Sequence, residues 1–307
     1  MNKYRERILN KGGKTGARII LPEHGDKRVQ DAGDELTLLG FKIVHSEDFQ
    51  NHADIYLDYI NTLPFTENWP VENLVEYLKN PLHYAMAMVA CDDADGLVAG
   101  AVTPSGDVIR TAIRMIGIRP TSNNVSSIFF MISPDGEKSY TFGDCAVIPE
   151  PDSKQLASIA AESADFHQLL TGEESIVAFL SYSTKGSASH YRVDKVKDAV
   201  EIFGHKYPNI IHDGEVQVDA AIIPDINKVK MPDSPIKGAA NVLIFPNLDA
   251  GNIAYKITQR LAGYSAWGPL LQGLNKPIHD LSRGCSVDDI INVSAITALQ
   301  RNIYANV

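Results

Sequence analysis

Cysteine is scarce in this sequence, and long apolar runs are absent. The three cysteines, Cys91, Cys145 and Cys285, stand far apart without a Cys-x-x-Cys pair, so we expect reduced, mostly buried thiols. No stretch approaches the roughly 18 apolar residues that are needed to cross a bilayer. The opening Met1–Gly16 segment is polar and lacks the apolar core of a signal peptide. These absences predict a cytoplasmic protein without membrane association.

Basic residues are also fewer than acidic residues in this sequence. The chain carries 28 lysines and arginines against 38 aspartates and glutamates, which gives a formal net charge of −10. Nonspecific binding of nucleic acid needs a broad basic surface, so this class of partner is excluded. A local basic cleft can still bind a small anion against the overall charge.

Several motifs of common enzyme classes are missing. There is no H-E-x-x-H and no clustered set of histidine and cysteine, so we expect no metal site. The G-x-G-x-x-G and G-x-x-x-x-G-K-[ST] patterns of nucleotide-binding loops are absent, as is the G-x-S-x-G turn of many hydrolases. These absences leave the reaction open.

What the sequence does contain is an alternation of short β-branched runs and amphipathic stretches, over a length of 307 residues that favours about two domains. This alternation predicts an α/β fold with a parallel or mixed sheet covered by helices on both faces. Strands are expected at 17–21, 40–44, 96–102, 125–132, 176–182 and 241–245, and helices at 27–39, 107–117, 153–170, 191–203, 252–261 and 287–304.

In such sheets, ligands bind where loops leave the carboxyl ends of the strands. One candidate loop contains Ser183, Thr184, Lys185, Gly186 and Ser187, between an expected strand and an expected helix. Hydroxyls, backbone N–H groups and a lysine at a helix N-terminus would bind a phosphate. The alternative is an ordinary polar turn.

A second candidate loop precedes the helix expected at 107–117. Asp107 is a suitable N-cap, and Arg110 would then lie in the first helical turn, where a cation opposes the helix dipole. This unfavourable position suggests that Arg110 binds an anion. Arg114 follows one turn later, so a solvated basic face is the alternative.

The third candidate loop precedes the last expected helix. Arg283 offers a planar donor pair for a phosphate or an oxyanion, Ser282 adds a hydroxyl, and Gly284 permits close approach of a ligand. Asp289 has a second interpretation, because Ser286 and Asp289 have the [ST]-x-x-[DE] spacing of a capping box.

Taken together, these loops and their neighbours resemble the phosphate acetyltransferase and phosphate butyryltransferase family. The likeness extends through most of the chain, and the later segments are more similar to the acetyltransferases. The matching segments are 19–23 with Arg28, 94–100, 142–146, 180–187, 213–219, 240–248, 251–256 and 280–286.

The resemblance implies a two-domain α/β/α fold similar to that of the isocitrate dehydrogenases, with the active site in the cleft between the domains. It places residues 1–122 and 272–307 in a first domain and residues 123–271 in a second. Members of the family are commonly homodimers, and they use neither a metal nor a cofactor.

The implied activity is the reversible transfer of an acetyl group between coenzyme A and inorganic phosphate, in which coenzyme A is a substrate. The thiol attacks the carbonyl of acetyl phosphate directly. Asp289 matches the proposed general base, Arg283 the arginine that binds phosphate and stabilises charge, and Ser282 the hydroxyl at the reacting carbonyl.

Further residues in matching motifs are expected to bind substrate. Arg110 matches a second phosphate-binding arginine, and Ser105 lies in its loop. The remaining expected binding residues are Ser183, Thr184, Lys185, Gly186, Ser187, Asn252, Lys256, Gly284 and Cys285. Cys285 as an acyl-accepting nucleophile is the rival mechanism, and a small packed residue is the preferred interpretation.

One departure from the family concerns coenzyme A. Members usually carry an Arg/Lys-rich segment after the second strand, whereas residues 43–78 contain no lysine or arginine here. This absence leaves open a regulatory paralogue that binds coenzyme A weakly. Two further alternatives stay open at this point: a propionyl- or butyryltransferase, and a metal-dependent decarboxylating dehydrogenase on the related fold.

Overall fold

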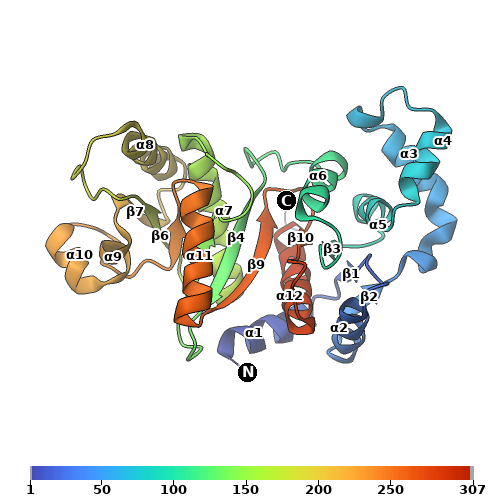
Figure 1. The fold of residues 1–307 in the computed structure, drawn as a ribbon, viewed down its shortest axis with the longest axis horizontal. Coiled ribbons are helices and arrows are strands. Elements are labelled where there is room, and N and C mark those ends of the chain that lie inside the picture. The colour runs from blue at the N-terminus through green and yellow to red at the C-terminus, as the bar shows by residue number, and fades with distance from the viewer. Residues whose placement is uncertain (1, 305–307) are drawn as a thin grey trace. The chain divides into compact units, whose positions relative to one another are not determined.

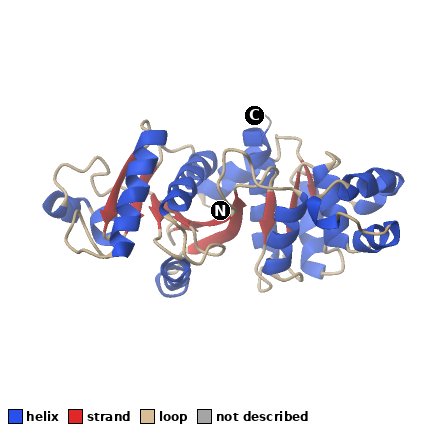
Figure 2. Ribbon diagram, turned by 90° about the horizontal axis from the view of Figure 1, so that it is seen from above, coloured by secondary structure: helices blue, strands red, loops and turns tan. Residues whose placement is uncertain are grey.

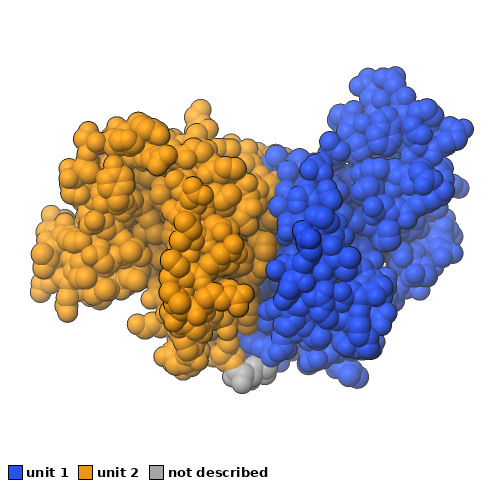
Figure 3. All heavy atoms as spheres, in the orientation of Figure 1, with its two compact units in different colours: residues 1, 5–119, 274–307 blue, residues 2–4, 120–273 orange. Residues whose placement is uncertain are grey.

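The computed structural model describes residues 2–304 (Figure 1). The described chain divides into two compact units: residues 5–119 with 274–304, here called the first unit, and residues 2–4 with 120–273, the second unit. Figure 3 colours the two units separately. Each unit contains a β-sheet with helices beside its strands (Figure 2), so the predicted α/β class is confirmed.

The first unit contains a four-stranded parallel sheet in the order β10-β3-β1-β2. Its strands are β1 (Arg18–Ile20), β2 (Lys42–Val44), β3 (Gly96–Ala99) and β10 (Ile278–Asp280). Every residue of β3 and of the edge strand β10 is buried, as expected for strands that are covered on both faces. The late segment that forms β10 thus pairs with the early part of the chain.

The helices that lie mostly in the first unit are α1 (Lys3–Gly12), α2 (Lys27–Leu38), η1 (Ser46–His52), α3 (Ala53–Asn61), η2 (Pro64–Thr66), α4 (Val71–Leu78), α5 (Pro81–Ala90), α6 (Ser105–Met115) and α12 (Val287–Tyr304). Helix α12 packs against α2, β1 and β3. Every residue from Ile290 to Gln300 is buried, which is typical of a helix enclosed on all sides. Helix α12 is therefore the central core element of this unit.

The second unit contains a six-stranded mixed sheet in the order β7-β6-β8-β5-β4-β9. Its strands are β4 (Ser126–Ile132), β5 (Ser139–Gly143), β6 (Ile176–Leu180), β7 (Ile211–Val216), β8 (Val242–Ile244) and β9 (Ser265–Gln272). Strands β5, β8, β6 and β7 run parallel, and β4 is antiparallel to both β5 and β9. Its helices are α7 (Ser153–Thr171), α8 (Tyr191–Lys206), α9 (Val218–Ile222), α10 (Pro224–Lys230) and α11 (Leu248–Ala262).

Alternation of side chains along β6 builds two cores in the second unit. Val177 and Phe179 belong to the core that contains residues of α7 and α8. Ala178 and Leu180 belong to the core that contains residues of α9 and α11. Successive residues of a strand point to opposite faces, so one short apolar strand contributes to both layers.

Most expected elements are present, with boundaries within a few residues. Helix α12 spans the predicted 287–304, and α7 begins with a capping box in which Asp152 and Gln155 bond to each other's backbone N–H. The N-cap assigned to Asp107 was wrong. Helix α6 begins at Ser105 after Pro104, whose extended backbone ends the preceding loop.

Close backbone contacts at α11 make Gly251 sensitive to substitution. A Cβ at this residue would collide with the carbonyl oxygen of Asp144 and lie 3.0 Å from Sγ of Cys145. We expect Gly251→Ala to lower the free energy of unfolding by about 1–3 kcal/mol. The matched control is Gly33→Ala in α2, where the nearest atom lies 3.9 Å away and alanine should be neutral or stabilising. Equal unfolding midpoints in urea for the two variants would contradict this prediction.

Candidate active site

Two of the three candidate loops leave the same edge of the first unit's sheet. Strands β3 and β10 are parallel neighbours, with Ala99 opposite Asp280. The loop after β3 leads to Ser105, and the loop after β10 carries Ser282 and Arg283. The topology therefore brings these two sets of predicted site residues to one sheet edge, as is common for ligand sites in α/β folds.

Glu23 holds the loop after β3. Its Oε2 accepts hydrogen bonds from the N–H groups of Gly100 (3.0 Å) and Ala101 (2.8 Å). Its Oε1 accepts from the N–H groups of Val102 (3.1 Å) and Thr103 (2.7 Å). Hydrogen bonds to a carboxylate are stronger than neutral ones, so four of them fix the course of this loop.

Arg28 connects the two loops. Its Nη1 donates to the carbonyl oxygens of Arg283 (2.9 Å) and Cys285 (2.8 Å), and its Nη2 donates to that of Ala101 (3.0 Å). The carboxylate of Asp26 accepts from Nε at 3.0 Å and from Nη2 at 2.7 Å. These bonds from Arg28 lower the pKa of Asp26 to about 2. Both Glu23 and Arg28 stand in the family-like motifs, but sequence alone gave them no role.

Arg283 is exposed on a loop whose backbone is held in place. Ser282, Arg283 and Gly284 are all exposed, while Arg28 holds the backbone beneath them. Among the described residues, none supplies a partner to the guanidinium of Arg283. A free guanidinium on a fixed backbone can bind a phosphate with two parallel hydrogen bonds.

Arg110 differs from Arg283 in its surroundings. It lies on exposed α6 surface and pairs with Asp107, whose Oδ1 lies 2.8 Å from Nη1 of Arg110. An exposed pair of this kind contributes little to stability, so it can open at small cost. The role of Arg110 in phosphate binding stays a prediction.

Asp289 forms the predicted capping box. Its Oδ2 accepts hydrogen bonds from the N–H (2.9 Å) and the hydroxyl (2.8 Å) of Ser286, and its own N–H donates to that hydroxyl (3.2 Å). The cap fixes the carboxylate at the entrance of the buried helix α12. Capping and catalysis are compatible. Oδ2 of Asp289 accepts both hydrogen bonds from Ser286, so Oδ1 is left to accept a proton.

Asp280 is a titratable group that the sequence did not single out. It ends β10, and its side chain is fully buried. Burial is the largest influence and, with the nearby charge of Glu23, raises the pKa of Asp280 to about 7. The hydroxyl of Ser105 and the N–H of Leu281 act in the opposite direction. The carboxyl group therefore titrates much closer to neutral pH than an ordinary aspartate, at the end of the strand that leads into the loop of Ser282 and Arg283.

Cys285 is buried beside these residues, with 6% of its surface exposed. Burial raises the pKa of its thiol, although the charge of Arg28 acts to lower it. Since the thiolate is the reactive form, a raised pKa opposes the rival mechanism in which Cys285 accepts the acyl group.

The remaining candidate loop, residues 183–187, lies in the second unit and is bound to β7. Ser183 and the N–H of Gly186 both donate to Oε1 of buried Glu215, at 2.8 and 2.7 Å. Lys185 pairs with Asp213 and also donates to the carbonyl of Gly214 at 3.2 Å. These donors are thus satisfied within the protein.

The remaining loop residues follow the same pattern. The N–H of Thr184 donates to the hydroxyl of Ser187 at 3.0 Å, and the hydroxyl of Thr184 donates to Gln217 at 3.2 Å. The expectation that this loop opens a helix was wrong. Helix α8 begins at Tyr191 and is capped by His190, so the loop is not at a helix N-terminus.

Asn252 and Lys256 lie one turn apart on α11, also in the second unit. The amide of Asn252 donates to the carbonyl of Cys145 at 3.1 Å, and Lys256 is exposed. The predicted site residues therefore form two groups, one in each unit, and their substrate-binding roles stay predictions. Among the described residues, no helix is both long and apolar enough to span a membrane.

Comparisons with known proteins agree with the resemblance found in the motifs. The sequence model of the phosphate acetyl/butaryl transferase family matches residues 14–298. The phosphate acetyltransferase of Acetivibrio thermocellus is 40% identical over 324 aligned residues, which cover 97% of this chain and 98% of that protein. The phosphate acetyltransferase of Staphylococcus aureus strain Mu50 is 49% identical over 233 residues, covering 75% of this chain and 70% of that protein.

Solved structures give the same result. The EutD phosphotransacetylase from Staphylococcus aureus superposes with a TM-score of 0.85 at 38% identity, covering 97% of this chain and 99% of that one. A phosphotransacetylase from Streptococcus pyogenes has a TM-score of 0.89 at 31% identity, with the same coverage. The resemblance inferred from the sequence is thereby confirmed.

The buried carboxyl of Asp280 predicts a pH-dependent stability. Its pKa is higher in the folded than in the unfolded chain, so the folded state binds more protons between about pH 4 and pH 7. The stabilising contribution is complete below this range and is lost as the pH rises through it. We expect Asp280→Asn to gain stability relative to the wild type as the pH rises from 4.5 to 8, by up to a few kcal/mol.

Urea unfolding at several pH values measures this difference. The control is Asp233→Asn, which changes an exposed aspartate and should follow the wild-type pH dependence. Parallel stability curves for Asp280→Asn and the wild type would show that the buried carboxyl does not titrate in this range.

Proposed function

Since this chain belongs to the phosphate acetyl/butaryl transferase family, we propose that it transfers an acetyl group reversibly between coenzyme A and inorganic phosphate. The observation that carries this proposal is 40% identity to a phosphate acetyltransferase over nearly the whole length of both chains. Curated relatives with 40–49% identity bear the same name, which favours acetyl over propionyl or butyryl transfer and disfavours a non-catalytic paralogue.

The proposed reaction is a direct transfer. The sulfur of coenzyme A attacks the carbonyl carbon of acetyl phosphate, and the thiol proton passes to Asp289. The tetrahedral intermediate then collapses, the bond to the phosphate oxygen breaks, and acetyl-CoA and phosphate leave. The proton returns from Asp289 to phosphate or solvent, so the protein is unchanged after each turnover.

Proton transfer explains why the site needs charge stabilisation. In water, an ordinary thiol and an ordinary aspartate differ in pKa by about 4.6 units, which makes full transfer unfavourable by roughly 6 kcal/mol. Transfer concerted with attack avoids the free thiolate, and a cation near the developing oxyanion lowers the barrier further. Arg283 can supply this cation and Ser282 a neutral donor, since both are exposed on the backbone that Arg28 fixes.

The second group of residues is proposed to complete substrate binding. Lys185 pairs with Asp213, so a phosphate would have to compete with a carboxylate for it. Asn252 and Lys256 present an amide and an ammonium one turn apart on α11. As the family resemblance implies, we also propose a cytoplasmic homodimer, and light scattering on the purified protein measures the oligomeric state.

The direct test is an assay of thioester formation from coenzyme A and a series of acyl phosphates. We expect the highest kcat/KM with acetyl phosphate, and lower values with propionyl and butyryl phosphate. Because residues 43–78 carry no lysine or arginine, a raised KM for coenzyme A is expected with a normal KM for acetyl phosphate. Absence of thioester formation with every acyl phosphate would refute the proposed function.

Arg283 provides a prediction for the charge-stabilising role. Arg283→Ala should lower kcat by on the order of 10²–10³, the usual loss for one oxyanion-stabilising donor. Arg283→Lys should recover only part of this loss, because a point charge cannot donate two parallel hydrogen bonds. Arg192→Ala changes an exposed arginine of α8 and should keep wild-type kinetics. If Arg283→Ala also kept them, the residue would have no part in the mechanism.

Asp289 provides a prediction that separates catalysis from capping. Asp289→Asn keeps an acceptor oxygen but removes the base, so kcat should fall by on the order of 10²–10⁴ with little change in Tm. Ser286→Ala is the matched control, because it removes the capping hydroxyl and keeps the carboxylate. It should cost about 0.5–2 kcal/mol of stability and leave kcat within a few-fold. The reverse pattern in the two variants would make Asp289 a cap only.

A further inference from the structure

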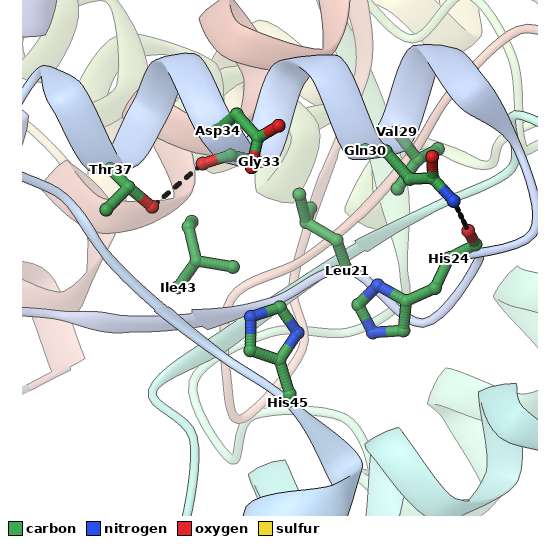
Figure 4. A pocket seen from close by; sticks show the side chains of 9 residues that line it. All are labelled: Leu21, His24, Val29, Gln30, Gly33, Asp34, Thr37, Ile43 and His45. Atoms are coloured by element: carbon green, nitrogen blue, oxygen red, sulfur yellow. Dashed lines mark hydrogen bonds between the residues drawn. The ribbon is translucent and has the colours of Figure 1, made fainter.

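Two histidines and a glutamate lie close together where β1 and β2 end. The strands are parallel, with Ile20 opposite Val44, so the segments that follow them leave the same sheet edge. His45 follows Val44 directly, and His24 lies in the turn after β1. Glu47 is in the first turn of η1. Figure 4 shows the imidazole rings of His24 and His45 beside each other.

The ligand atoms of these side chains are close enough to share an ion. One ring nitrogen of His24, one of His45 and a carboxylate oxygen of Glu47 all lie within 4.8 Å of one another. The two ring centroids are 5.1 Å apart, with the planes inclined by 46°, so the rings are not stacked flat. Bonds from zinc to nitrogen and oxygen are about 2.0–2.2 Å long. Small rotations of the exposed His45 and Glu47 side chains would bring all three ligand atoms within this distance of one ion.

His24 supplies the strongest sign that a partner belongs here. Its Nε2 is buried and has no hydrogen-bond partner among the described residues. A buried polar atom without a partner costs free energy, and native structures usually satisfy such atoms. The amide of Gln30 donates to the backbone carbonyl of His24 at 2.6 Å, which holds the residue in place without satisfying the ring.

Space for an ion and its water ligands adjoins the rings. A cavity of about 140 Å³ is bounded by His24 and His45, and Leu21, Val29 and Ile43 contribute apolar wall. Burial, with the neighbouring His45, lowers the pKa of His24. A neutral imidazole offers the lone pair that a metal ion requires.

We propose that His24, His45 and Glu47 bind a divalent transition-metal ion, with zinc as the test ion. Two imidazoles and one carboxylate form a ligand set that zinc occupies in proteins and that leaves a position for water. The site is separate from the residues assigned to acetyl transfer, so it does not rest on the proposed function.

The expected consequence of binding is structural. His24 follows Glu23, whose carboxylate holds the four N–H groups of residues 100–103. A metal ion that joins His24 to His45 and Glu47 would cross-link the turn after β1 to the start of η1. Binding to the folded state alone raises stability, so the ion should raise Tm.

The experiment uses the full chain after treatment with a chelator. Zinc is titrated by calorimetry, and cobalt(II) is used to record an absorption spectrum of the bound ion. We expect one equivalent of zinc to bind and to raise Tm. His45→Gln and Glu47→Gln alter exposed residues, should fold normally, and should each weaken binding about tenfold or more. His205→Gln, an exposed histidine on α8 near Glu201, is the matched control and should bind as the wild type does.

The outcomes separate this site from other metal ligands. A cobalt spectrum without thiolate charge-transfer bands, together with weaker binding in both variants, supports the proposal. Thiolate bands would assign the ion to a cysteine and overturn it. Absence of stoichiometric zinc binding, or equal affinity in the wild type, His45→Gln and Glu47→Gln, would also overturn it. Acetyl-transfer activity, measured in parallel, decides the proposed function independently.

Discussion

Two charged side chains from one short segment, Glu23 and Arg28, determine where the loops beyond β3 and β10 lie. Glu23 accepts four backbone N–H bonds from residues 100–103, and Arg28 donates to carbonyls on both loops. Loop backbone that leaves a sheet edge has no strand partner, so side chains must satisfy its polar groups. The geometry of Arg283 therefore depends on a residue that is 255 positions away in the sequence.

The buried helix α12 adds a second constraint to the same edge. Residues 290–300 are enclosed by the first unit, so the helix cannot shift along its axis without disturbing the core. The capping box of Ser286 and Asp289 fixes the first turn of this helix. The proposed base thus gains its position from an ordinary helix cap, and one residue can serve stability and chemistry through different oxygens of its carboxylate.

The sequence predicts structural features that depend on neighbouring residues better than features that depend on residues far away in the chain. Local patterns are reliable: α12, α7 and the Ser286–Asp289 capping box were all predicted from neighbouring residues. Strands β5, β7, β9 and β10 were not predicted from periodicity, since they are short or contain glycine and proline. Their pairing partners, rather than their own composition, make them strands.

The same distinction applies to the sites. The motifs identified Ser282, Arg283 and Asp289 because they stand within eight residues of one another. Glu23 and Arg28 lay in a family-like motif, but the sequence did not predict what they do. The backbone groups to which they bond lie far away along the chain. Asp280 could not be singled out, because the pKa of a carboxyl depends on burial that the sequence does not display.

The histidine and glutamate cluster shows most clearly why a motif search can miss a site. His24 and His45 are separated by 21 positions, and no metal-ligand spacing of the usual kind joins them, so the sequence predicted no metal site. The parallel pairing of β1 with β2 brings the two histidines close in space, because the ends of both strands lie at one edge of the sheet. A strand pair of this kind can assemble a ligand set from segments that carry no recognisable signal alone. The chemistry at a sheet edge is therefore set by strand order as much as by residue spacing.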